Sequence, residues 1–166
     1  MIIRNEMESD IEAIAEVTKI AFATCPYGEH TEQFIVNALR AAGALTVSLV
    51  AQVGPDVVGH VAFSPVTISD GSPDWYGLGP VSVLPQYQKR GIGTALIRAG
   101  LSLLKARGGK GCVLVGPPAY YQRFGFRNLP ALTLEGAPQE VFLALPFEDQ
   151  TPRGVVAFHS AFLAHG

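Results

Sequence analysis

Apolar side chains recur at the spacing of one helix face in two stretches near the N-terminus. In residues 7–23, MESDIEAIAEVTKIAFA, Ser9 and Glu12 have the spacing of a capping box at the start of such a helix. Residues 30–43, HTEQFIVNALRAAG, repeat the pattern, with Thr31 as the N-cap and a closing glycine as the stop. The pattern therefore predicts two amphipathic helices at the beginning of the chain.

The middle of the chain has the pattern of strands. Residues 45–53, LTVSLVAQV, and 57–68, VVGHVAFSPVTI, are β-branched runs on either side of a Gly-Pro-Asp turn, which predicts an antiparallel hairpin. Residues 75–85, WYGLGPVSVLP, predict a third strand, in which Gly79 and Pro80 indicate a bulge instead of a regular ladder. We therefore expect a sheet to follow the two helices.

The second half of the chain alternates between helix and strand. Residues 91–107 predict an amphipathic helix that packs on a sheet. The buried run 111–116, GCVLVG, then predicts a strand parallel to the third one, because a helical crossover between strands of one sheet is almost always right-handed. The remaining predicted elements are a short helix over PPAYYQRF, residues 117–124, and two strands over EVFLALPF and GVVAFHSAFL, residues 140–147 and 154–163. The whole pattern predicts an α/β fold with a mixed sheet.

The composition limits the class of protein. With 166 residues, of which 48% are hydrophobic and 16% charged, the chain fits one compact soluble domain over residues 1–166. No apolar run approaches the ~20 residues that a membrane helix needs, and the N-terminus has early acidic residues instead of a secretory signal. We therefore expect a cytoplasmic protein without a membrane partner.

Net charge and cysteine spacing argue against two further classes. The formal net charge of −2 argues against a nucleic-acid partner, because proteins that bind nucleic acid usually carry an excess of basic residues. Cys25 and Cys112 lie far apart and form no CxxC pair, so the sequence indicates neither a disulfide framework nor a thiolate zinc site. We expect a function that uses no metal.

Two glycine-containing segments, one before and one after the predicted helix over residues 91–107, were compared with known phosphate loops, and neither fits. A Walker loop around Gly109 would need glycine at position 104 and serine or threonine at position 111, where the chain has leucine and glycine. A dinucleotide GxGxxG motif from Gly91 would need glycine at position 96, which is Leu96. The pattern that remains is QxxGxG, from Gln88 to Gly93.

This QxxGxG segment has the features of an anion site. Gly91 and Gly93 have no side-chain bulk, so a polyphosphate can approach the main chain there. The first N–H groups of the following helix have no intrahelical partners, and the helix dipole favours negative charge beside them. We therefore expect a pyrophosphate group at this turn. The alternative is an ordinary strand-to-helix turn in which glycine only permits tight packing.

A second segment, AYYQRFGF at residues 119–126, follows the QKRGIG segment, and together they resemble the GNAT superfamily of N-acetyltransferases. GHVAFSPV and LGPVSVLPQYQ add a similarity to a bacterial branch called YhbS-like, and the order of elements from Met1 to about Leu163 fits the fold. The resemblance implies a mixed, mostly antiparallel central sheet of about six to seven strands with about four helices. It also implies transfer of an acetyl group from acetyl-coenzyme A directly to a primary amine, on a small molecule or a protein, by a monomer or homodimer.

The resemblance also implies which residues hold acetyl-coenzyme A. The pantetheine arm would lie along the third strand as an extra edge, and the pyrophosphate would bind the main chain of the loop. These residues are Val81, Ser82, Val83, Gln88, Lys89, Arg90, Gly91, Ile92, Gly93 and Thr94. The bulge at Gly79 and Pro80 agrees with this implication, because it would separate the strand from residues 111–116 and free its edge groups.

Two groups would carry the chemistry. The backbone N–H near Val83 can stabilise the developing oxyanion, as preorganised donors do in acyl transfer. By the resemblance, Tyr121 is the general acid that protonates the departing thiolate, since a tyrosine hydroxyl of pKa ~10 can be matched to a thiol of pKa ~8.5. Tyr120 is the alternative acid, and packing of a short helix against the sheet is the alternative role of Tyr121.

The amine acceptor and its base are less defined by the sequence. Tyr27, Glu29 and His30 lie between the first two helices, where the family usually forms its acceptor site, although a solvated helix start also explains these charges. His60 has apolar neighbours on its strand, so we expect a hydrogen-bonded core histidine and assign no base. Two other functions stay open, a catalytically silent module that binds acyl-coenzyme A, and an acyltransferase with another acyl donor or a hydroxyl acceptor.

Overall fold

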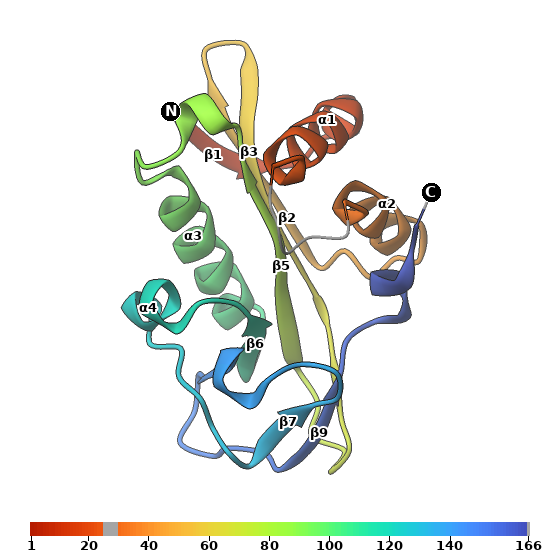
Figure 1. Cartoon of the computed structure of the whole chain (residues 1–166), viewed down its shortest axis with the longest axis vertical. Helices are drawn as coiled ribbons and strands as arrows, with labels where there is room; N and C mark the ends of the chain where they lie inside the picture. The colour runs from red at the N-terminus through yellow and green to blue at the C-terminus, as the bar shows by residue number, and fades with distance from the viewer. Residues whose placement is uncertain (25–29, 166) are drawn as a thin grey trace.

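The computed structural model describes residues 1–24 and 30–165, and its framework is a central sheet (Figure 1). In these residues the sheet has six strands in the order β1-β2-β3-β5-β6-β8. Neighbouring strands are antiparallel except β5 and β6, which are parallel. The strands are β1 (Ile2–Asn5), β2 (Val47–Val53), β3 (Asp56–Pro65), β5 (Trp75–Val83), β6 (Gly111–Val115) and β8 (Phe142–Pro146).

Four α-helices in the described part of the chain cover the two faces of this sheet (Figure 1). One face carries α1 (Ile11–Phe22) and α2 (Glu32–Ala41), and the other carries α3 (Ile92–Ala106) and α4 (Pro118–Tyr121). The mostly antiparallel mixed sheet with four helices confirms the predicted fold class. None of the helices in the described residues is long and apolar enough to cross a membrane.

A smaller sheet lies at one end of the central sheet (Figure 1). Its strand order in the described residues is β4-β9-β7, with β4 (Thr67–Ile68), β9 (Gly154–Ala157) and β7 (Leu132–Leu134). The prediction of one strand over residues 154–163 is therefore wrong in its second half, where His159 Nδ1 accepts a hydrogen bond from Ala161 N–H at 3.0 Å and a 3-10 turn follows. The 3-10 turns are Glu8–Asp10, Pro85–Tyr87, Gln122–Phe124, Gln139–Val141 and Ser160–Leu163.

The N-terminus also differs from the prediction. Strand β1 pairs with β2 at the edge of the sheet, although the pattern indicated no strand before the first helix. Ser9 does not cap α1 but lies inside a 3-10 turn. The Asp10 carboxylate instead accepts hydrogen bonds from Met7 N–H at 2.7 Å and from the Arg4 guanidinium at 2.7 and 3.0 Å. Asp10 therefore has the part of the acidic residue in a capping box at the 3-10 turn Glu8–Asp10, and its side chain makes no cap hydrogen bond to α1.

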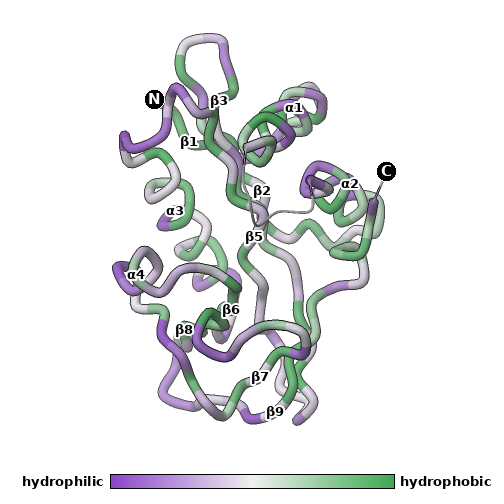
Figure 2. The backbone as a smooth tube through the Cα atoms, in the orientation of Figure 1, coloured by the Kyte–Doolittle hydropathy of each residue, from purple (hydrophilic) through white to green (hydrophobic). Residues whose placement is uncertain are grey.

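Helix α3 packs on the sheet through a glycine. The largest core cluster joins side chains of α3 with side chains of β2, β3 and β6. Within it the ring of Phe63, on β3, lies against Gly100 of α3, and a Cβ atom at position 100 would overlap that ring. Figure 2 shows that the segment before α3 is hydrophilic, whereas much of α3 is apolar. The contact between Phe63 and Gly100 determines how closely α3 approaches the sheet.

Strand β5 is bulged, as its sequence predicted, and it separates from β6 just before the bulge. The pairing of β3 with β5 shifts between Val61 and Phe63, opposite the segment that contains Gly79 and Pro80. The parallel pairing of β5 with β6 covers only three residue pairs and ends at Gly77. From there to Val83, one edge of β5 therefore has no neighbouring strand among the described residues.

Candidate functional site

The free edge of β5 presents main-chain groups toward the loop before α3. The side-chain amide of Gln88 donates a hydrogen bond to the Val83 carbonyl at 2.9 Å, which shows that this carbonyl points away from β3. Main-chain groups of successive strand residues point to opposite edges, so Val81 shares the free edge with Val83, and Ser82 faces its partner His60 on β3. The free edge therefore offers the N–H groups of Val81 and Val83.

The loop after β5 exposes the start of α3. Gly91 precedes the helix with a φ of +83°, a left-handed conformation that strains any residue with a side chain, and Lys89 has a φ of +63°. The first helical residue, Ile92, is buried and anchors the helix start in the core. Among the described residues no side chain caps this helix end, so its first N–H groups are open to a ligand.

A cavity of about 320 Å³ lies over this helix start. It is lined by Val83, Tyr87, Gln88, Lys89, Gly91, Ile92, Gly93, Thr94, Tyr120 and Arg123. The structure thus brings together most of the residues that the sequence placed around the anion, and it adds Tyr87, Tyr120 and Arg123. It leaves Arg90 outside this lining, with its guanidinium 5.5 Å from the centre of the Tyr87 ring.

Arg123 is held firmly at this cavity. Its guanidinium carbon lies 4.3 Å from the centre of the Tyr120 ring, and its Nε donates to the Tyr120 carbonyl at 2.9 Å. Tyr120 is fixed in turn, because its hydroxyl lies 3.0 Å from Thr94 Oγ1 in the first turn of α3. The spacing of Tyr120 and Arg123 in the sequence is that of neighbours on one helix face, so the pair was visible there but was not used.

Tyr121, beside Tyr120, has a different environment. Its ring packs against those of Phe124 and Phe126, with centroids 6.1 Å apart in both pairs, on the α3 side of the sheet. Burial, with smaller contributions from Tyr120 and Cys112, raises the pKa of Tyr121 to about 12. The hydroxyl of Tyr121 is therefore protonated at neutral pH and can serve as a donor.

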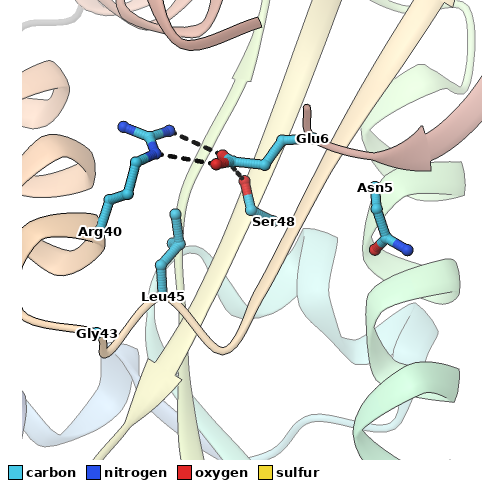
Figure 3. A pocket seen from close by; sticks show the side chains of 6 residues that line it. All are labelled: Asn5, Glu6, Arg40, Gly43, Leu45 and Ser48. Carbon is cyan, nitrogen blue, oxygen red and sulfur yellow. Dashed lines mark hydrogen bonds and ion pairs between the residues drawn. The ribbon is translucent and has the colours of Figure 1, made fainter. Parts of the chain in front are cut away.

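The opposite side of the sheet carries a chain of polar side chains (Figure 3). Arg40 of α2 holds the Glu6 carboxylate through two hydrogen bonds, of 2.9 and 2.8 Å. Ser48 of β2 donates its hydroxyl to the same carboxylate at 2.5 Å, and Ser48 Oγ lies 2.7 Å from His60 Nε2. Burial raises the pKa of Glu6, but the hydrogen bonds from Arg40 and Ser48 outweigh burial, and the net pKa is lowered. A cavity of about 270 Å³ opens at Glu6, Arg40 and Ser48.

His60 is the inner end of this chain and is a buried core histidine, as expected. Its side chain is fully buried, and burial lowers its pKa to about 4. Three buried side-chain atoms lack a hydrogen-bond partner in the described residues: Glu32 Oε1, His60 Nδ1 and Ser64 Oγ. All three belong to α2 or to β3.

The predicted acceptor residues are only partly described. Tyr27 and Glu29 lie outside the described residues. His30 is exposed, with a φ of 60°, just before α2. Within residues 1–24 and 30–165, no group of three or more His, Cys, Asp and Glu side chains could hold a metal ion.

Comparison with known proteins gives one consistent result. Residues 12–126 match the model of the acetyltransferase (GNAT) family. The uncharacterized N-acetyltransferase YhbS of Escherichia coli (strain K12) is 35% identical over 127 residues, which are 76% of this chain and 73% of that protein.

Two solved structures extend this result to the fold. A GNAT family acetyltransferase from Brucella melitensis in complex with acetyl-CoA is 48% identical, with a TM-score of 0.87 over 97% of each chain. The structure of YhbS from Escherichia coli in complex with CoA is 30% identical, with a TM-score of 0.89 over 99% of this chain and 93% of that one. The chain belongs to the acetyltransferase (GNAT) family.

Proposed function

We propose that this protein, as one domain over residues 1–166, transfers the acetyl group of acetyl-CoA directly to a primary amine. The observation that carries the proposal is the cavity in which the uncapped start of α3 meets the free edge of β5. A helix N-terminus binds phosphate, and an open strand edge binds an extended amide chain, so the two suit the two halves of coenzyme A. The Brucella melitensis relative, which holds acetyl-CoA, supports this assignment.

The pyrophosphate would lie between the start of α3 and Arg123. The N–H groups of Ile92, Gly93 and Thr94 form one side of this arrangement, and the cation of Arg123 lines the same cavity. Because Tyr120 already fixes Arg123, little side-chain entropy is lost when an anion binds. Lys89, which also lines the cavity, adds a second positive charge.

The pantetheine arm would run from this cavity along β5 toward the bulge. Val81 and Val83 supply the free main-chain groups on that path, and Ser82 supplies none because it faces β3. The thioester end would therefore reach the place where β5 and β6 separate, beyond Gly77. We place two groups next to this separation. They are the acid Tyr121, which follows β6, and the amine acceptor on the side of the sheet that carries α1 and α2.

The chemistry needs an oxyanion donor and a proton source for the thiolate. The N–H of Val83, or of Val81 on the same edge, would stabilise the charge that develops on the thioester oxygen. Tyr121 would donate its proton toward the sulfur as the carbon–sulfur bond breaks. Its raised pKa keeps it protonated, and a hydrogen bond to the developing thiolate then strengthens as charge accumulates on the sulfur.

A thiol-release screen tests the proposal. The protein is incubated with acetyl-CoA and with amines, amino acids, polyamines and peptides, and the release of free thiol is measured. We expect acetyl-CoA to bind and at least one class of amine to be acetylated. Binding without turnover on any amine would instead identify an acyl-CoA binding module. Preference for propionyl-CoA or succinyl-CoA, or for a hydroxyl acceptor, would identify a different acyltransferase.

A further inference from the structure

The hydrogen bonds of the Glu6–Ser48–His60 chain determine which nitrogen of His60 carries a proton. Ser48 has one hydroxyl hydrogen, and it goes to the Glu6 carboxylate. Ser48 Oγ therefore accepts a hydrogen bond from His60, whose Nε2 lies 2.7 Å away. When His60 is neutral, its proton is therefore on Nε2, and its Nδ1 carries a free lone pair.

This lone pair has no partner in the described residues, although His60 is fully buried. A buried polar atom without a hydrogen bond destabilises the folded protein, and such atoms are rare unless they serve a ligand, a water or a reaction. Nδ1 is an acceptor only, so its missing partner must be a donor. An amine or a water molecule bound to an amine has that chemistry.

His60 lies next to the strand that would carry the acetyl donor. It pairs with Ser82 across β3 and β5, and both side chains point to the face covered by α1, where Ser82 Oγ donates to Thr18 Oγ1 at 3.3 Å. The bulge of β5 follows directly, and Ser64, with the second unpartnered atom of β3, lies beyond it on the same face. Unpartnered polar atoms thus flank the bulge on the α1 and α2 side, opposite the side of α3.

We propose that His60 accepts the proton of the attacking amine at Nδ1, directly or through one water, and that Ser48 and Glu6 are positioning residues for it. This inference rests on the proposed function. As the carbon–nitrogen bond forms, the nitrogen becomes positively charged and more acidic, its N–H bond breaks, and an N–H bond forms at Nδ1. The resulting imidazolium faces the Glu6 carboxylate through Ser48. His60 then releases this proton to solvent, and Tyr121, having given its proton to the thiolate, regains one from solvent, so the exchange balances.

The charges around His60 fit this role. Glu6, held as an anion by Arg40, favours a positive imidazole, whereas burial and Arg40 itself oppose it. Ser48, which is hydrogen-bonded to His60, and Thr18, which is hydrogen-bonded to its partner Ser82, do not titrate. His60 is therefore neutral in the resting protein, and its lone pair is available at neutral pH.

Two substitutions test the proposal in the full-length protein, with an accepted amine from the thiol-release screen. His60→Gln can keep the hydrogen bond to Ser48 through its side-chain amide but cannot accept a proton. We expect it to lower the single-turnover rate by about 100-fold and to leave the acetyl-CoA dissociation constant within about twofold. Ser48→Ala should lower the rate less and move the acidic limb of the pH–rate profile to lower pH, because the imidazolium loses its link to Glu6.

A purely structural role predicts different results. If His60 and Ser48 are only structural, both variants should lose stability and the pH–rate profile should not change. A near-normal rate in folded His60→Gln would overturn the proposal. If either variant fails to fold, the native protein is tested by NMR with nitrogen-labelled histidine. Addition of the amine with CoA should change the chemical shift of His60 Nδ1. An unchanged chemical shift would overturn the proposal. The absence of turnover in the native protein would refute the proposed function itself, and a normal rate in His60→Gln would refute only the role of His60.

Discussion

The side-chain amide of Gln88 donates a hydrogen bond to the main-chain carbonyl of Val83, 2.9 Å away. Gln88 is exposed, and the bond joins the loop to the end of the strand from which that loop starts. The bond occupies the Val83 carbonyl and leaves the Val83 N–H free. Gln88 thus sets the direction in which the loop carries the chain to Gly91 and α3.

Replacing Gln88 by Ala should loosen this connection. One exposed neutral hydrogen bond contributes at most ~1 kcal/mol, so we expect the free energy of unfolding to fall by no more than this amount. Acetyl-CoA affinity should fall by up to about fivefold, because the ligand must then order the loop. Isothermal calorimetry and urea unfolding measure the two quantities. Gln86→Ala, at an exposed position of the preceding turn, is the matched control, and an equal loss of affinity in both variants would contradict a specific role of Gln88.

Gly93→Val should block the anion site. A Cβ atom at position 93 would face the Tyr120 hydroxyl at 3.7 Å and Val83 Cγ2 at 3.8 Å, so the added methyl groups would enter the cavity. We expect acetyl-CoA affinity to fall at least tenfold, about 1.4 kcal/mol or more. Gly91→Val should also weaken binding, but it adds backbone strain because of the positive φ. Unchanged calorimetric binding in folded Gly93→Val would exclude a pyrophosphate at this turn.

Tyr121→Phe should slow the chemical step. The substitution keeps the ring contacts with Phe124 and Phe126 and removes only the hydroxyl. If that hydroxyl protonates the thiolate, the single-turnover rate should fall by about 100-fold while acetyl-CoA binding is retained.

Tyr120→Phe is the control for this experiment, and the structure gives it a distinct result. The Tyr120 hydroxyl contacts Thr94 at the proposed anion site, so its removal should weaken acetyl-CoA binding and leave the chemical step nearly unchanged. A nearly full single-turnover rate in Tyr121→Phe would show that the Tyr121 hydroxyl is structural.

The low pKa of His60 predicts how stability depends on pH. The imidazole has a pKa of about 4 in the folded protein and about 6.5 in the unfolded chain, so the unfolded chain binds more protons between these values. The free energy of unfolding should therefore decrease as the pH falls, by roughly 2 kcal/mol from this group between pH 7 and pH 4.5.

Urea unfolding of the native protein and of His60→Gln at both pH values isolates this contribution. Carboxylates such as Glu6 titrate in both proteins, so only the difference between the proteins reports on His60. We expect His60→Gln to lose less stability than the native protein on acidification. Parallel losses would mean that His60 is not buried as a neutral group.

Much of the fold could be predicted from periodicity, and the failures have physical causes. Helices α1 to α3 and the hairpin of β2 and β3 have long, regular patterns, whereas β1 has only four residues at an edge. In residues 154–163 the chain stays largely apolar past Ala157, but the strand ends there because His159 Nδ1 accepts a hydrogen bond from Ala161 N–H. An apolar run does not distinguish a strand from a 3-10 turn. Here the turn brings the Phe162 ring against that of Phe158, with the ring centroids 5.2 Å apart.

The candidate site was predictable where it depends on main-chain geometry. Gly91, which has a positive φ, and the bulge at Gly79 were visible in the sequence because few other residues permit such conformations. Gly93 was visible because it has no side chain to fill the cavity. The place of Arg123 at the cavity depends on the packing of Tyr120 against α3. The link from Glu6 to His60 joins residues from three separate segments, and no local pattern could indicate it.

The contact between Gly100 and Phe63 influences the proposed anion site from a distance. Position 100 lies deep in α3, yet a rigid helix transmits a displacement along its whole axis, so lifting α3 off the Phe63 ring also moves its first turn. The affinity for acetyl-CoA should therefore depend in part on the packing of Gly100 against Phe63 in the core. A methyl group added at position 100 should therefore weaken binding at the proposed anion site, and a smaller side chain at position 63 should restore it.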